Sequence, residues 1–130
     1  MVHEKFTAEE IAKYRAQYPG VVVIAHPECP EDVINASDFA GSTQQMIEYV
    51  EKDKPSKVVL ITECSMSDNI QAAHPEMQLV RPCQLCPHMK KITLPKILDC
   101  LQNETGEVFV DPAIAERARH PIQRMLDMSK

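Results

Sequence analysis

The sequence Val21-Val22-Val23-Ile24-Ala25 is a continuous run of β-branched and small apolar residues that follows the turn residues Pro19-Gly20. Such a run is typical of a strand that is buried on both faces, as in a parallel sheet. Val58-Val59-Leu60-Ile61 repeats the pattern further along the chain. We expect both runs to form buried strands, with two weaker strands at Gln78-Leu79-Val80 and Val108-Phe109-Val110.

Helical periodicity fills the segments between these runs. Thr7 and Glu10 have the spacing of a capping box, in which an N-cap Ser or Thr is followed three residues later by Glu or Gln. We expect helices over residues 7–18, across 30–39, from 43 to the break at 55–56, from 93 to 101, and from 111 onward with an interruption at 120–121. The last helix is expected to turn Ile122, Met125 and Leu126 inward.

This alternation of strands and helices predicts an α/β fold. We expect one domain over residues 1–130, with a three-layer αβα arrangement around a short, mostly parallel sheet of about four strands. A chain of 130 residues is the size of one ordinary domain. Its 44% apolar and 25% charged residues exclude a disordered chain.

The charge balance and the hydropathy pattern exclude several classes of partner. Nineteen acidic and fourteen basic residues give a net charge of −5, which argues against a general nucleic-acid binder and against binding to anionic membranes. No apolar run approaches the roughly 18 residues needed to cross a bilayer, and the first ten residues do not have the composition of a signal peptide. We therefore expect a cytoplasmic protein that binds neither nucleic acid nor membranes.

His26 and Glu28 follow the first buried run, at the edge of the sheet where open α/β folds bind their ligands. Their spacing of two places both side chains on the same side of an extended chain, where they could move protons together or hold a polar substrate. The spacing alone favours a more ordinary interpretation, in which Glu28 begins a helix and His26 closes the end of the sheet.

Gly41-Ser42-Thr43 is a second candidate site, at the expected start of a helix. Two hydroxyl groups and the free backbone N–H groups of a helix N-terminus can bind phosphate or carboxylate. An ordinary Ser or Thr N-cap explains the same residues. The polar residues 62–69 after the second run are mostly explained as turn and cap residues.

Five cysteines, an odd number, favour free thiols or metal ligands over a fully paired secreted framework. Cys83-Gln84-Leu85-Cys86 is a CxxC motif, which suits a metal ion, an iron–sulfur cluster or a redox pair. A structural zinc site usually takes four ligands from two such pairs, whereas this chain has one pair with His88 nearby. We expect Cys29, Cys64 and Cys100 to be structural residues.

Taken together, these segments resemble the quinolinate synthase family, the iron–sulfur enzymes of de novo NAD biosynthesis. The matching motifs extend in order along the whole chain: Val2-His3-Glu4-Lys5-Phe6, Tyr18-Pro19-Gly20, His26-Pro27-Glu28-Cys29-Pro30, Gly41-Ser42-Thr43, Thr62-Glu63, Cys86-Pro87-His88-Met89-Lys90 and Arg124-Met125-Leu126-Asp127. Several short motifs in series are far more specific than any one of them.

The resemblance implies that this chain is the third of three homologous α/β domains, with a lead-in helix over residues 7–18. In the family, three cysteines, one from each domain, hold a [4Fe–4S] cluster and leave one iron open for substrate. Cys86 matches the ligand of the third domain, and Cys83 becomes a candidate redox neighbour. The second ligand is expected just upstream of Val2, so two of the three ligands lie outside these residues. The N-terminal domains are candidate partners on a separate polypeptide.

The resemblance also implies an enzyme of the transferase class, which condenses iminoaspartate with dihydroxyacetone phosphate to give quinolinate, phosphate and water. It assigns proton transfer and substrate binding to His26 and Glu28, and binding of the substrate anion to Ser42 and Thr43. We expect the isolated chain to be inactive. Two alternatives remain open: a small zinc- or redox-binding module built on the CxxC motif, and an inert remnant that folds without chemistry.

Overall fold

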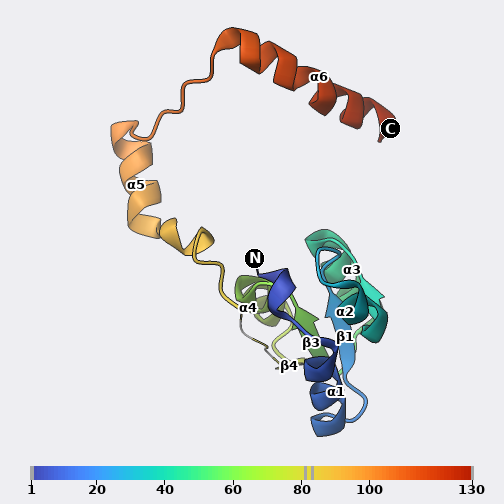
Figure 1. Ribbon diagram of the computed structural model, residues 1–130. Coiled ribbons are helices and arrows are strands. Elements are labelled where there is room, and N and C mark those ends of the chain that lie inside the picture. The colour runs from blue at the N-terminus through green and yellow to red at the C-terminus, as the bar shows by residue number, and fades with distance from the viewer. Residues whose placement is uncertain (1, 81, 83, 130) are drawn as a thin grey trace. The chain divides into compact units, whose positions relative to one another are not determined.

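A computed structural model describes residues 2–80, 82 and 84–129 of the chain. The chain divides into two compact units, Met1–Lys91 and Ile92–Lys130. Figure 1 shows the first unit as a sheet with helices packed around it, and the second as helices joined by an extended segment. Each unit is described by itself below.

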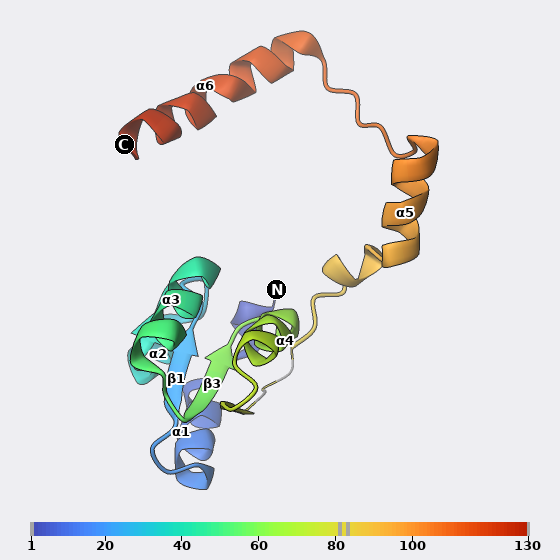
Figure 2. The ribbon, with the colours of Figure 1, turned by 180° about the vertical axis from the view of Figure 1, so that it is seen from behind.

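The first unit is built on a four-stranded sheet in which every pair of neighbouring strands is parallel (Figure 2). Its strand order is β2-β1-β3-β4, and the strands are β1 (Val22–Ala25), β2 (Phe39–Ala40), β3 (Lys57–Ile61) and β4 (Gln78–Val80). The two β-branched runs pair along their length, from Val22 opposite Val58 to Ala25 opposite Ile61. The expected mostly parallel sheet is therefore confirmed.

Helices connect these strands and cover both faces of the sheet. They are α1 (Ala8–Gln17), α2 (Glu31–Ala36), α3 (Thr43–Asp53) and α4 (Cys64–Ala73), with short 3₁₀ helices η1 (His3–Lys5) and η2 (Met89–Lys91). The predicted capping box of Thr7 and Glu10 begins α1. Ser42 and Gln45 form a second capping box at the start of α3. Both boxes satisfy backbone N–H groups that the first helical turn leaves without partners.

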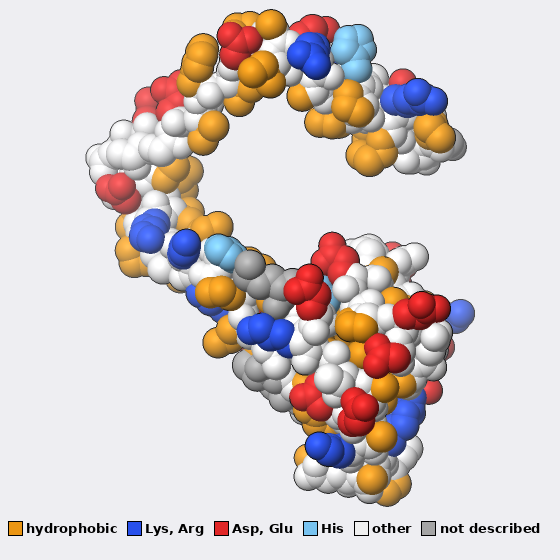
Figure 3. Space-filling view, in the orientation of Figure 1, with side chains coloured by type: hydrophobic (Ala, Val, Ile, Leu, Met, Phe, Trp, Pro, Cys, Tyr) orange, Lys and Arg blue, Asp and Glu red, His pale blue; other side chains and the backbone are white. Residues whose placement is uncertain are grey.

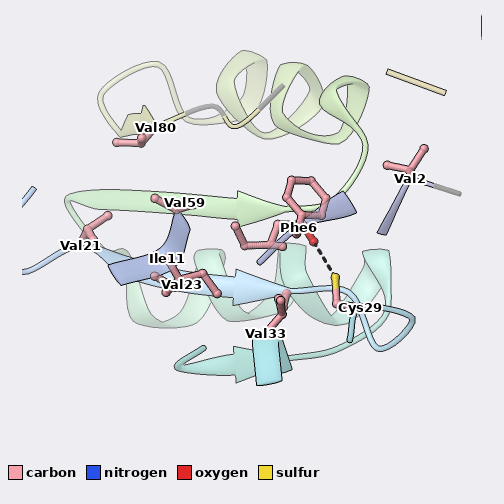
Figure 4. Close-up of a cluster of buried hydrophobic side chains, with 11 residues drawn as sticks. Val2, Phe6, Ile11, Val21, Val23, Cys29, Val33, Val59 and Val80 are labelled. Atoms are coloured by element: carbon pink, nitrogen blue, oxygen red, sulfur yellow. Dashed lines mark hydrogen bonds between the residues drawn. The ribbon is translucent and has the colours of Figure 1, made fainter. Parts of the chain in front are cut away.

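The core forms two clusters because successive side chains of a strand point to opposite faces. On one face, Val23 and Val59 pack with residues of α1 and α2 (Figure 4). On the other face, Ile24 and Leu60 pack with residues of α3 and α4. This arrangement is the predicted three-layer αβα architecture.

Three of the elements predicted before residue 111 differ in the structure. The helix expected across residues 30–39 ends at Ala36, and Phe39–Ala40 instead pairs with β1 as β2. The polar segment expected to be mostly turn forms α4, because Glu63 caps a helix whose buried face carries Met66 and Ile70. The weak strand expected at residues 108–110 is wrong, since these residues have no regular structure and their side chains are exposed.

The second unit consists of two amphipathic helices, α5 (Leu94–Asn103) and α6 (Pro112–Met128). The interruption expected at His120-Pro121 is wrong: α6 continues through Pro121, which removes one backbone hydrogen bond while its fixed φ angle remains helical. The inward orientation expected for Ile122, Met125 and Leu126 is also wrong, since these residues are 50–59% exposed. Hydrophobic side chains are accordingly visible on the surface of this segment in Figure 3.

Within the residues that the structure describes, no helix combines the length and the apolar character needed to cross a membrane.

The two-cluster core predicts that Leu60→Ala will lower the free energy of unfolding by about 2–5 kcal/mol, because truncating a buried leucine removes apolar contacts and leaves a cavity. Leu60 is fully buried in the cluster between the sheet and α3. Leu94→Ala is the matched control, since it removes the same atoms from a residue that is 81% exposed. Urea unfolding of both variants, followed by circular dichroism, makes the comparison. An equal loss of stability in the two variants would contradict this description of the core.

Candidate functional site

A cleft of about 420 Å³ lies at the carboxyl end of the sheet in the first unit. Its lining comes from η1, from the residues that follow β1, β2 and β3, and from η2: His3, His26, Thr43, Ile47, Thr62, Glu63, Ser65, Met66, Asn69 and Met89. Parallel strands present their carboxyl ends at the same edge, which is where open α/β sheets bind ligands. The expected location of the site is therefore matched by a cleft of suitable size for a small molecule.

His26 is fixed at the end of β1 by its main chain and by its ring. Its backbone N–H donates to the carbonyl of Ile61, 3.2 Å away on β3. Its ring Nδ1 accepts the backbone N–H of Glu28 at 3.2 Å. A neutral imidazole that accepts at Nδ1 carries its proton on Nε2. His26 therefore has an Nε2–H donor that its own loop does not use.

His3 is a site residue that reasoning about strand ends missed. Its ring stacks on the ring of His26, with centroids 4.3 Å apart and planes 7° from parallel. Its Nδ1 lies 3.0 Å from a carboxylate oxygen of Glu28 and its Nε2 lies 3.2 Å from the hydroxyl of Thr62. The carboxylate can only accept, so Nδ1 carries the proton and Nε2 of the neutral ring accepts from Thr62.

The sequence does contain a signal for His3. Val2 and Phe6 on either side of η1 are buried in the core cluster beneath α1. These two apolar residues anchor η1, and with it His3, at the carboxyl end of the sheet. The sequence signal for His3 is therefore the apolar pair Val2 and Phe6, four residues apart with the histidine between them.

Burial lowers the pKa of His26, and the neighbouring His3 lowers it further, whereas Glu28 acts in the opposite direction and raises it. Both imidazole side chains are largely shielded, with 17% of His3 and 21% of His26 exposed, while Glu28 is 73% exposed. The net effect is a lowered pKa, which favours the neutral form of His26. At neutral pH His26 is therefore suited to donate a hydrogen bond from Nε2.

Ligand atoms of His3, His26 and Glu28 lie within 4.8 Å of one another, which is close enough to consider a metal ion. Imidazole binds metals through lone pairs that lie in the plane of the ring. Because the two rings are stacked nearly parallel, these lone pairs lie in parallel planes and do not converge on one point. The arrangement is better suited to handling protons than to holding a metal.

The two hydroxyl residues of the Gly41-Ser42-Thr43 motif have different environments. Thr43 lines the cleft. The Ser42 hydroxyl accepts the backbone N–H of Gln45 at 3.3 Å, and Ser42 is not among the residues lining the cleft. Gly41 is needed for close packing, since a Cβ at this position would lie 2.6 Å from the ring of Phe39. The structure thus brings Thr43 into the cleft with His26 and leaves Ser42 as the N-cap of α3, while Glu28, like Ser42, is not among the residues lining the cleft.

A hydrogen bond to Glu63 places the backbone of Cys86 beside the cleft. The backbone N–H of Cys86 donates to Oε1 of Glu63 at 3.4 Å, and Glu63 lines the cleft. The Cys86 thiol is free and half-buried. Among the other described free cysteines, Cys29 is buried with its thiol 3.5 Å from the carbonyl of Ile61 (Figure 4), and Cys100 is an exposed residue of α5. Burial also raises the pKa of Cys29, so its thiolate is disfavoured.

Cys86 therefore fits one ligand of an iron–sulfur cluster, which is bound by thiolates. The described residues of the first unit offer no second free thiol beside it that is accessible to such a group. A cluster at Cys86 would need further ligands from elsewhere. The expectation for Cys83 lies outside the described residues.

The stacked histidines predict opposite effects of two substitutions on the pKa of His26. Replacing His3 by Asn should raise it, because the adjacent ring no longer opposes the charge of His26 and its removal exposes the ring. Glu28→Gln should lower it, because the carboxylate that favours the charged form is removed. NMR titration of the His26 ring protons measures both shifts, and the wild-type midpoint should lie below the ordinary value of 6.5. Shifts in the same direction would contradict this account.

The lowered pKa of His26 determines how this residue changes the stability of the fold with pH. A histidine with a lowered pKa binds fewer protons when folded than when unfolded, so its contribution to stability rises as the pH increases through the folded and unfolded pKa values. His26 should therefore disfavour the fold at mildly acidic pH.

Comparisons with known proteins cover nearly the whole chain. The family model NadA, described as quinolinate synthetase A protein, matches residues 1–127. Proteins named quinolinate synthase from Sinorhizobium fredii and Agrobacterium fabrum are 56% and 54% identical to the chain over 99% and 98% of its length. One from Xylella fastidiosa is 54% identical over 96%. The chain spans 36–37% of the length of these three relatives. It belongs to the quinolinate synthetase A protein family.

Proposed function

We propose that this chain supplies one wall of a quinolinate synthase active site, in which iminoaspartate and dihydroxyacetone phosphate condense to quinolinate. The observation that carries the proposal is the cleft in which His26, His3, Thr43 and Thr62 meet, with Cys86 tied to its edge through Glu63. Membership of the family supports the reaction. Since the chain spans about a third of its relatives, the remaining walls of the pocket come from other parts of a longer protein or from a separate polypeptide.

In this proposal His26 donates from Nε2 to a substrate oxygen. Its Nδ1 is held by the N–H of Glu28, so the orientation of the ring is fixed before substrate binds. The lowered pKa keeps the ring neutral, so His26 polarises the substrate oxygen with a hydrogen bond and keeps its own proton. The loop of Glu28 positions the donor.

His3 accepts a proton at Nε2 in the same proposal. Glu28 bonds to the opposite nitrogen and stabilises the imidazolium that forms, as a carboxylate behind a histidine does in other proton-transfer sites. The hydroxyl of Thr62 is the group through which His3 contacts the cleft. Glu28 therefore serves both histidines, and the predicted pair His26–Glu28 becomes a triad with His3.

Thr43 binds a substrate anion in this proposal, since it lies in the first turn of α3 and lines the cleft. We propose a smaller role for Ser42, which positions Thr43 by capping α3. Cys86 is proposed as a ligand of a [4Fe–4S] cluster, which would supply a Lewis acid to polarise substrate oxygens. The proposed location is the cytoplasm, where reducing conditions preserve free thiols such as that of Cys86.

The zinc- or redox-binding alternative uses the CxxC motif alone. It gives no role to the stacked histidines or to Thr43, which together line the cleft. The inert alternative likewise leaves the convergence of these polar groups unexplained. We therefore propose the condensation reaction as the function of the longer protein and expect the isolated chain to lack it.

A chimera tests this proposal: the chain replaces the matching third of the Agrobacterium fabrum quinolinate synthase, to which it is 54% identical. The chimera should bind iron and sulfide and form quinolinate. His26→Ala should cut turnover by roughly 10²-fold or more, the usual contribution of a positioned hydrogen-bond donor, with iron content unchanged. Cys86→Ser should lose the cluster.

Cys100→Ser is the matched control for the cysteine, because Cys100 is an exposed thiol of α5. This variant should keep both iron and turnover. Equal loss of iron in the His26 and Cys86 variants would overturn the division of roles. A chimera that folds and binds iron but forms no quinolinate would overturn the proposed reaction.

A further inference from the structure

We propose that Glu63 is a positioning residue that holds the segment 84–90, and with it Cys86, against the end of β3 at the cleft. The role of Cys86 as a cluster ligand rests on the proposed function. The contacts that Glu63 makes do not depend on that proposal. Glu63 directly follows Thr62, whose hydroxyl bonds His3. Thr62 and Glu63, two adjacent residues that follow β3, thus contact the histidine pair and the segment that contains Cys86.

The Glu63 carboxylate makes contacts that an N-cap alone does not need. One oxygen, Oε2, accepts the backbone N–H of Ser65 at 2.7 Å, which caps α4. The other oxygen, Oε1, accepts the backbone N–H of Cys86 at 3.4 Å and lies 3.7 Å from Nζ of Lys90. One carboxylate therefore joins the start of α4 to both ends of a five-residue stretch that contains the cysteine.

Backbone contacts set this stretch beside β3. Glu63 and Gln84 form an isolated parallel bridge, and the carbonyl of Gln84 accepts the N–H of Cys64 at 3.3 Å. The carbonyl of Cys86 accepts the N–H of Lys90 at 3.1 Å, and the Lys90 ammonium donates to the Ser65 hydroxyl at 2.7 Å. The bridge is a single pair, and the Glu63 carboxylate is the side-chain group that bonds the backbone of Cys86 itself.

The charge of Glu63 is consistent with this role. Its side chain is 11% exposed, and burial by itself would raise its pKa. The hydrogen bonds from Ser65 and Cys86 and the charge of Lys90 lower it, and the net shift is downward. A buried carboxylate that stays ionised forms stronger hydrogen bonds than a neutral group, so the anchor persists at neutral pH.

The alternative is that Glu63 only caps α4. Glu63→Asp separates the two roles, because aspartate is a favoured N-cap residue but is one methylene shorter and cannot reach Cys86 and Lys90 as well. Glu63→Gln is the second variant, since it keeps the length and removes the charge. Glu10→Asp is the matched control: Glu10 closes the capping box at the start of α1, where its carboxylate accepts the backbone N–H of Thr7.

Amide hydrogen exchange, measured by NMR on the 130-residue chain, tests the proposal. In Glu63→Asp the Cys86 N–H should exchange roughly tenfold faster, as expected when a hydrogen bond to a charged group is lost, while amides 68–73 of α4 keep wild-type rates. Glu63→Gln should give a smaller acceleration, and Glu10→Asp none at Cys86. Wild-type exchange at Cys86 in Glu63→Asp would overturn the proposal. If Glu63→Asp does not fold, wild-type exchange at Cys86 in Glu63→Gln would overturn it.

Iron binding by the chimera separates this inference from the proposed function. If the parent chimera binds iron and Glu63→Asp binds it several-fold more slowly, both hold. If the parent binds none, the proposed function fails, and the exchange rates still decide the role of Glu63. If both bind iron at the same rate, Glu63 does not position the ligand and the inference fails.

Discussion

The parallel pairing of β1 with β3 is the constraint on which the rest of the first unit depends. Its register places Ala25 opposite Ile61, so the two strands end together, and the next residues of each chain segment, His26 and Thr62, emerge at one edge. The hydrogen bond from the His26 N–H to the Ile61 carbonyl continues the ladder to that edge. A shift of the register by one residue would move the core side chains to the opposite face and would separate the groups that His3 bridges.

Much of this arrangement was predictable because it follows from local pattern. The runs around Val23 and Leu60 are apolar on both faces, and a continuous β-branched run has few stable solutions other than a buried parallel strand. The capping box of Thr7 and Glu10 and the position of His26 at a strand end are local features as well. Each of these is set by residues that lie within a few positions of one another.

The errors arise where a tertiary contact decides the outcome. The two-residue strand β2 exists because Phe39 and Ala40 pair with Ile24 and Ala25, and no propensity in so short a segment reveals that. The run at residues 108–110 has the composition of a strand but no partner strand among the described residues. His3 was missed for the same reason, since its contacts with Glu28 and Thr62 span 25 and 59 residues of sequence.

The two carboxylates at this end of the sheet show how environment divides chemically similar groups. Glu28 is 73% exposed and interacts with imidazoles, so water and the histidines both have access to it. Glu63 is almost enclosed and is surrounded by N–H and ammonium donors that lower its pKa. A carboxylate that is enclosed by hydrogen-bond donors is held in one position, whereas one that is exposed beside two histidines can interact with both. The difference in burial is consistent with the two proposed roles, in which Glu28 supports the histidines and Glu63 holds the segment of Cys86.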